Sequence, residues 1–244
     1  MSSSPKTIRL GVLVPSSNTA LEPLTQSIIS TIPNVTVHFS RFRVTQISLS
    51  SDALSQFDQK NLVEAAKLLA DADVDAIGWS GTSAGWLGFE ADEQLCAAII
   101  AATGKPATTS VLALNKALEL FGVTKLGLVT PYLPDVQAKI VENYGSIGVD
   151  AGAERHLSRS DNVRFAQIDE KTLDPMVAEV VREGVQAVTT FCTNLSAAQH
   201  AARWEKEHGV PVFDTVTTVV WDLLRLCGVN TKGVVGWGRL ISAV

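Results

Sequence analysis

The chain has 244 residues, of which 46% are hydrophobic and 18% are charged, a composition typical of a folded globular protein and unlike that of a disordered one. Its formal net charge of -5 at pH 7 provides no basic excess for binding nucleic acid or anionic membranes, so we expect a small-molecule partner. No apolar run reaches membrane-spanning length and residues 1–7 lack the apolar core of a signal peptide, so we expect a cytoplasmic protein.

Short apolar runs alternate with longer amphipathic stretches, a pattern typical of βαβ units around a buried parallel sheet. In chain order, the predicted strands are 8–14, 35–42, 76–80, 106–109, 126–129, 185–191 and 210–213. The predicted helices between and after them are 52–69, 91–102, 111–120, 133–144, 173–182, 197–207 and 217–226. The sequence therefore predicts the α/β class.

A weak internal repeat divides the chain into two halves. The pairs of similar segments are 10–15 with 126–131, 74–83 with 185–194, and 106–110 with 211–215. The repeat predicts two pseudosymmetric parallel-sheet α/β domains, residues 1–115 and 116–215, with the segment from about 216 to 244 able to pack back on the first. No linker rich in Pro, Gly or Ser separates them, so we expect a tight cleft between the halves.

Small and polar residues gather where the predicted strands end. Ligands of open α/β sheets bind beyond the carboxyl ends of the strands, so these residues should line one cleft. Backbone N–H groups and hydroxyls at such positions can hold a carboxylate as its charge grows. The residues at these strand ends that we expect to bind substrate are Pro15, Ser16, Asn18, Gly81, Thr82, Ser83, Tyr132, Thr193 and Asn194.

Cys192 is the predicted catalytic residue, because it follows a strand at one of the repeated positions. A helix starting just after it would lower its pKa and let it exchange a proton near neutral pH. Cys96 falls within a predicted helix and Cys227 directly follows the last residue of another, and both are interpreted as core residues. The cysteines and histidines show no ligand spacing, so no metal site is expected.

Four motifs, at 14–19, 81–83, 130–132 and 192–194, resemble those of the maleate isomerase and arylmalonate decarboxylase branch of the aspartate/glutamate racemase superfamily. The resemblance implies a cofactor-free enzyme with its site between two α/β domains. It also implies that Thr82, Ser83, Tyr132 and the backbone around Cys192 form a dioxyanion hole. Asn18 and Asn162 resemble carboxylate-binding residues, and the family's habit of self-association makes a homo-oligomer an expectation.

The chain departs from the two-cysteine members of this superfamily at Gly81, where those enzymes carry their first cysteine. By resemblance, a Gly-Thr-Ser segment with one cysteine in the second half is the decarboxylase arrangement. Because Gly81 and Cys192 are at repeated positions, we expect them to face each other with room for a substrate carbon between them.

The leading hypothesis is decarboxylation of a 2-substituted malonate or a similar activated diacid, with Cys192 as the proton donor. The first alternative is maleate cis-trans isomerisation or racemisation of an aspartate-, glutamate- or hydantoin-type acid. The second is a non-catalytic protein that binds small diacids. In each case the expected partner is a small carboxylic acid.

Overall fold

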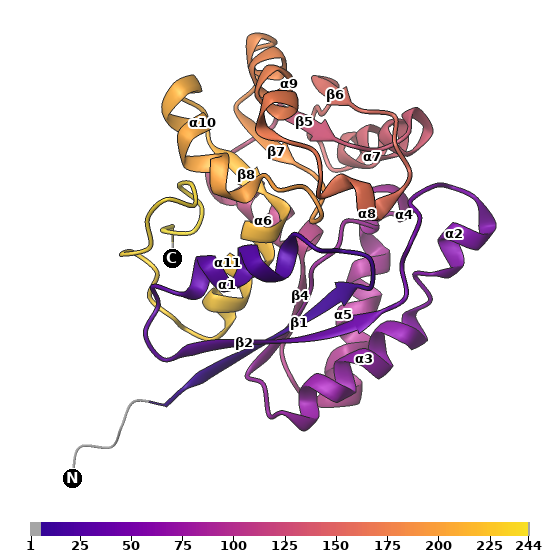
Figure 1. Ribbon diagram of the computed structural model, residues 1–244, viewed down its shortest axis with the longest axis vertical. Helices are drawn as coiled ribbons and strands as arrows, with labels where there is room; N and C mark the ends of the chain where they lie inside the picture. The colour runs from indigo at the N-terminus through magenta and orange to yellow at the C-terminus, as the bar shows by residue number, and fades with distance from the viewer. Residues whose placement is uncertain (1–5, 244) are drawn as a thin grey trace.

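The computed structural model describes residues 6–243 and contains two four-stranded parallel sheets, one in each half of the chain. Their strand orders are β2-β1-β3-β4 and β6-β5-β7-β8, so corresponding strands occupy corresponding places. Figure 1 shows the first half in indigo and magenta below the second half in pink and orange. The prediction of two pseudosymmetric parallel-sheet α/β domains is therefore confirmed. Residues 1–5, on which part of the signal-peptide prediction rests, lie outside the described residues.

The strands are short and mostly buried. They are β1 (Ile8–Pro15), β2 (Val35–Phe42), β3 (Ala76–Trp79), β4 (Ala107–Thr109), β5 (Leu126–Thr130), β6 (Glu154–His156), β7 (Ala187–Thr190) and β8 (Val212–Asp214). The sequence prediction missed only β6, because this three-residue edge strand is half-buried and carries no apolar run. Continuous apolar runs mark strands that are buried on both faces, and β6 is not buried in this way.

The helices of the first half are α1 (Leu21–Ile29), α2 (Ser51–Ser55), α3 (Gln59–Asp71), α4 (Ala84–Leu87), α5 (Phe89–Thr103) and α6 (Ser110–Phe121). Those that follow are α7 (Pro134–Ser146), α8 (Asn162–Phe165), α9 (Glu170–Arg182), the 3-10 turn η1 (Ala198–His200), α10 (Ala201–His208) and α11 (Thr215–Leu226). None of the helices in residues 6–243 has the length and apolar character needed to span a membrane.

The predicted helix over 52–69 is in fact two helices, α2 and α3. Asp58 interrupts it, because its carboxylate accepts a 2.8 Å hydrogen bond from the Lys60 amide and so begins a new helix. The break places Phe57 between the two helices, where its ring packs edge-on against Trp86 with 5.9 Å between centroids.

Helix α11 follows the last strand of the second half but packs against the first sheet, next to α6 and α1. In Figure 1 it lies among the elements of the first half. The contact explains Gly78 in β3, since a Cβ atom there would lie 2.8 Å from Leu223 Cδ1 and Val219 Cγ2. The chain thus crosses back and ties the two halves together.

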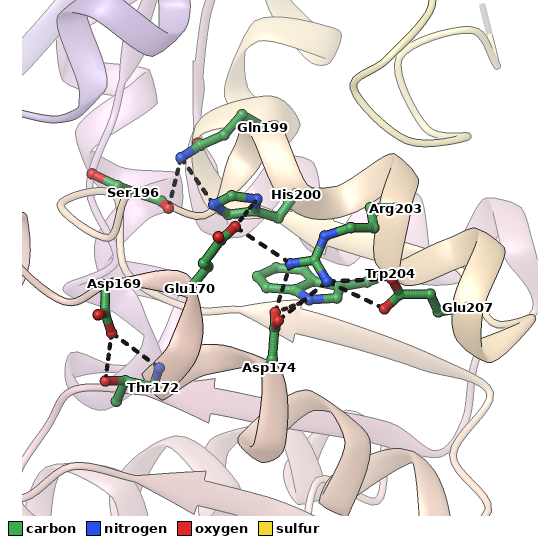
Figure 2. A network of polar contacts seen from close by, with 10 residues as sticks. All are labelled: Asp169, Glu170, Thr172, Asp174, Ser196, Gln199, His200, Arg203, Trp204 and Glu207. Atoms are coloured by element: carbon green, nitrogen blue, oxygen red, sulfur yellow. Dashed lines mark hydrogen bonds and ion pairs between the residues drawn. The ribbon is translucent and has the colours of Figure 1, made fainter.

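On the second half, ion pairs join α9 to α10 (Figure 2). Arg203 contacts Asp174 at 2.6 Å, and the Trp204 indole N–H donates to the same carboxylate at 2.7 Å. His200 lies beside Glu170 at 3.5 Å in this surface network. This arrangement anchors α10 and gives His200 a structural setting remote from the strand ends described next.

Candidate active site

A small cavity of about 20 Å³ lies between the two halves, at the carboxyl ends of the strands. Its lining combines motif residues with a set of apolar side chains, namely Pro15, Val44, Ile47, Phe57, Trp79, Gly81, Thr82, Ser83, Trp86, Tyr132, Asn162, Cys192 and Thr193. A larger groove of about 570 Å³ beside α6 contains none of the motif residues. Convergence of the strand ends, and not size, therefore identifies the candidate site.

The cavity brings together Cys192 and seven of the ten residues expected to bind substrate. The seven are Pro15, Gly81, Thr82, Ser83, Tyr132, Asn162 and Thr193. Asn162 begins α8, and its side-chain amide donates a 2.8 Å hydrogen bond to Ser17 of the first half. Ser16, Asn18 and Asn194 do not line the cavity.

Asn18 and Asn194 instead hold the two halves together. The Asn18 side-chain oxygen accepts hydrogen bonds of 3.0 Å from the amides of Ala20 and Leu21 at the start of α1, and its amide donates to Thr193 at 3.2 Å. Asn194 accepts from the Ala20 amide at 3.2 Å and donates to the Asn162 carbonyl at 2.5 Å. Both side chains already have partners, so their role in this structure is to position the neighbouring lining residues.

Ser16 bridges the ends of β1 and β2, where its hydroxyl accepts from the Val44 amide at 3.1 Å. Arg41 is fixed nearby by an ion pair of 2.8 Å with Glu22. Its guanidinium donates to the carbonyls of Ser16 and Asn18, each at 3.0 Å. Arg41 therefore holds the loop that follows β1 in place and is not part of the cavity wall.

Hydroxyls from both halves meet inside the cavity. The Thr82 and Tyr132 hydroxyl oxygens lie 2.7 Å apart. A hydrogen bond from the Tyr132 hydroxyl also favours a lower pKa of the Cys192 thiol. The Tyr132 ring packs edge-on against Trp86, with 5.4 Å between centroids. Burial raises the pKa of Tyr132 well above its usual value, so the phenol stays a hydrogen-bond donor. Together these groups can donate hydrogen bonds to one carboxylate.

Cys192 differs from its sequence-based description in one respect. No α-helix starts directly after it, because η1 begins only at Ala198. The thiol is 2% exposed, and its burial raises its pKa to about 12. Hydrogen bonds lower the Cys192 pKa, from the Tyr132 hydroxyl and from the backbone N–H groups of Asn194 and Leu195. The effect of burial is larger than theirs. The expectation of a lowered pKa is therefore wrong, and in the free protein this group is a protonated thiol at neutral pH.

Asp214 is a buried acid whose charge influences the Cys192 thiol. It caps α11 and accepts a 2.6 Å hydrogen bond from the Thr190 hydroxyl. Its negative charge adds to the upward shift of the Cys192 pKa. The other two cysteines lie away from the cavity. Cys96 is buried in α5, whereas Cys227, expected in the core, is only half-buried because it ends α11.

Sequence reasoning missed three wall residues, Val44, Ile47 and Phe57. Val44 and Ile47 lie in the irregular stretch between β2 and α2, where no periodicity indicates which side chains turn inward, and Phe57 lies at the break between α2 and α3 that the sequence did not predict. Trp79 and Trp86, which flank the Gly-Thr-Ser segment, also line the cavity. The lining, all of it within residues 6–243, includes no Lys, Arg or His.

The expected room beside Gly81 is filled. A Cβ atom on Gly81 would lie 2.0 Å from Cζ2 of Trp79 and 2.3 Å from its Cε2. The Trp79 ring therefore covers the α-carbon of Gly81, and a side chain at position 81 has no space unless this ring moves.

No group of three or more His, Cys, Asp or Glu side chains in the described part of the chain is arranged to hold a metal ion. The chemistry that these residues themselves supply is hydrogen-bond donation to a carboxylate, together with proton donation from one thiol.

Comparison with known proteins places this geometry in a family. The family model for arylmalonate decarboxylase matches residues 10–241. The chain is 25% identical to a maleate isomerase of Geobacillus stearothermophilus, over 97% of this chain and 98% of that one. It is 26% identical to the arylmalonate decarboxylase of Bordetella bronchiseptica, over 75% of this chain and 78% of that one.

Solved structures agree in fold. The maleate isomerase of Pseudomonas putida S16, in a cysteine-to-alanine variant with maleate, is 25% identical, with a TM-score of 0.88 over 98% of this chain and 99% of that one. A liganded double variant of arylmalonate decarboxylase is 21% identical, with a TM-score of 0.83 over 96% and 98% of the two chains. Because the family model matches residues that form both sheets and the cavity between them, the chain belongs to the arylmalonate decarboxylase family of enzymes.

Proposed function

We propose that the protein decarboxylates a 2-substituted malonate, or a similar activated diacid, with Cys192 as its only proton donor. The observation that carries the proposal is the cavity's single thiol, together with the Trp79 ring that covers Gly81. A mechanism with an acid/base group on each side of the substrate carbon needs a second such group, and the described lining offers no second thiol.

The reaction begins with the substrate carboxylate that is retained. Thr82, Ser83, Tyr132 and the backbone near Cys192 donate hydrogen bonds to it and stabilise the charge that it gains. The other carboxylate lies against the apolar wall, where no cationic side chain pairs with it. Desolvation there favours its loss as CO2, because the neutral product is better tolerated than the anion.

Breaking the C–C bond releases CO2 and leaves its electron pair on the substrate as an enediolate. The Cys192 S–H then gives its proton to the former C2 carbon of the malonate, forming the monocarboxylate and leaving Cys192 as a thiolate. The thiolate recovers a proton from solvent before the next turnover. A thiol with a raised pKa suits this role, because it is protonated when the enediolate forms.

Maleate isomerisation is the second candidate, since the similarity to a maleate isomerase covers nearly the whole of both chains. It would require a sulfur nucleophile, or a proton, to add to the double bond. Burial disfavours the Cys192 thiolate, which weighs against the nucleophilic route. Racemisation and non-catalytic binding of a diacid remain further outcomes to test.

The test is a substrate screen of 2-aryl- and 2-alkylmalonates, maleate, and amino and hydantoin-type acids, run in buffer containing EDTA. Decarboxylation is followed by CO2 release and isomerisation by fumarate formation. The expected result is CO2 release from a substituted malonate, with a product of one handedness. Fumarate without CO2 would replace the proposal by isomerisation, racemised amino or hydantoin-type acids would replace it by racemisation, and saturable binding with no turnover would indicate a binding protein.

A further inference from the structure

Trp79 ends strand β3, in the middle of the first sheet, and its side chain is 1% exposed. Its ring lies two residues before Gly81 and folds over that residue's α-carbon. The atoms closest to a Cβ on Gly81 would be Cζ2, Cε2 and Cη2, at 2.0, 2.3 and 2.5 Å. These three atoms lie along one edge of the six-membered ring of the indole, so this edge occupies the place of any side chain at position 81.

The ring is held in this position by packing. Phe42, at the end of β2, lies 5.0 Å from it between ring centroids. Trp79 also borders a second cavity of about 40 Å³, lined in part by Leu62 and Asp92, so it contacts both that space and the cavity that holds Cys192. A well-packed aromatic ring of this size does not move at low cost.

The indole N–H adjoins Cε2, one of the atoms that cover Gly81. Among residues 6–243 this buried N–H has no hydrogen-bond partner. Because Trp79 lines the cavity that holds Cys192, this donor is available to an acceptor atom of a bound molecule. The edge of Trp79 that covers Gly81 therefore also faces the space where substrate would lie.

We propose that Trp79 makes this site one-sided: its ring fills the space from which an acid/base group at position 81 would reach the substrate carbon, so that Cys192 alone delivers a proton. The inference rests on the proposed function for its chemistry, but its steric part stands on geometry alone. It makes Trp79 a specificity-determining residue for the handedness of the product.

The inference changes what Gly81→Cys would do. With Trp79 present, the new side chain collides with the ring, and the thiol cannot reach the substrate carbon. Trp79→Leu removes the obstructing atoms, because a leucine side chain ends at its δ carbons whereas the collisions involve Cε2, Cζ2 and Cη2. Gly81→Cys in a Trp79→Leu background should therefore have room for its thiol.

The steric part is tested by a double-mutant cycle of melting temperatures with the wild type, Trp79→Leu, Gly81→Cys and the double variant. We expect Gly81→Cys to lower Tm clearly in the wild-type background and to lower it much less, or to raise it, in the Trp79→Leu background. Equal shifts of Tm in the two backgrounds would overturn the proposal. If Gly81→Cys does not fold in the wild-type background but folds with Trp79→Leu, the cycle supports it.

The chemical part is tested by exchange of the C2 hydrogen of (R)- and (S)-2-phenylpropanoate in D2O, followed by NMR and chiral chromatography. In the double variant, one sulfur takes the C2 proton and the other returns a deuteron to the opposite face. We expect exchange with inversion at least about tenfold faster than in either single variant, since a positioned acid/base group contributes roughly 10² to 10⁴ in rate. Equal inversion in Gly81→Cys alone, or none in a double variant that still decarboxylates, would overturn the inference.

The two failures are distinguishable. If the wild type releases no CO2 from any malonate while the Tm cycle shows coupling between positions 79 and 81, the proposed function fails and the steric finding stands. If the wild type decarboxylates and the cycle shows no coupling, the inference on Trp79 fails alone.

Discussion

The hydroxyl oxygens of Thr82 and Tyr132 lie 2.7 Å apart, although the two residues come from opposite halves of the molecule. Each follows a central strand of its own sheet, β3 and β5, so the contact joins the two repeats inside the cavity. A carboxylate bound there would be held by donors from both halves at once.

Tyr132→Phe should reduce the turnover of the malonate identified in the screen. The change removes one donor to the developing enediolate but keeps the ring that packs against Trp86 and Phe165. Loss of one such donor typically costs about 10² to 10³ in kcat. Steady-state kinetics measure the effect, and circular dichroism checks the fold. An unchanged kcat would remove Tyr132 from the proposed dioxyanion hole.

Cys192→Ala should lower kcat by a factor of about 10² to 10⁴, the usual contribution of a positioned proton donor, without unfolding the protein. The matched control is Cys96→Ala, another buried cysteine, which lies in α5 away from the cavity. It should lower the melting temperature through the space that it leaves and keep kcat. The reverse pattern would mean that the wrong cysteine has been assigned.

The pH dependence of kcat/KM separates proton donation from nucleophilic attack by Cys192. Burial raises the pKa of this thiol to about 12, so its protonated form persists across the ordinary range and is lost only as pH rises through that value. A proton donor should therefore give no alkaline loss from Cys192 between pH 7 and 10. A thiolate nucleophile would give a rate that increases about tenfold per pH unit over the same interval. The profile is measured on the wild type with stopped-time product assays.

Asp92→Asn should change how stability depends on pH. Burial raises the Asp92 pKa from 3.8 to about 7, so its contribution to stability is present below pH 3.8 and is lost as pH rises to about 7. At about 1.4 kcal/mol per pKa unit, the variant should gain up to about 4 kcal/mol relative to wild type over that range. Urea unfolding at pH 4.5, 6 and 8 measures it, with the exposed neighbour Glu93→Gln as control. A constant difference between Asp92→Asn and wild type would contradict the shift.

Gly78→Ala should destabilise the fold, because its Cβ would press on Val219 and Leu223 of α11 at 2.8 Å. Overpacking of this kind costs about 1–3 kcal/mol. Gly145→Ala is the control, since this glycine lies inside α7 and its added Cβ meets nothing within 4 Å. Alanine there should stabilise by about 0.5–1 kcal/mol through helix propensity. Denaturant unfolding compares the two, and a neutral Gly78→Ala would show that α11 packs less tightly on β3.

By itself, the sequence determined the two-sheet α/β architecture and much of the cavity. Buried parallel strands leave continuous apolar runs, and the repeat indicates two similar sheets. Strand ends of one parallel sheet lie at the same edge, so Tyr132 and Cys192 could be brought together without coordinates, and the repeat places Thr82 at the corresponding edge of the first sheet. The sequence did not predict the edge strand β6, because its half-exposed residues form no apolar run.

Only the tertiary structure decided the character of the cavity. The pKa of Cys192 depends on how fully neighbouring segments bury it, and the space beside Gly81 depends on the direction of the Trp79 ring. Asn18 turned out to join the halves because its partners, such as Thr193, lie far away along the chain. Burial, ring orientation and long-range hydrogen bonds arise from packing between distant segments, and local sequence patterns do not record them.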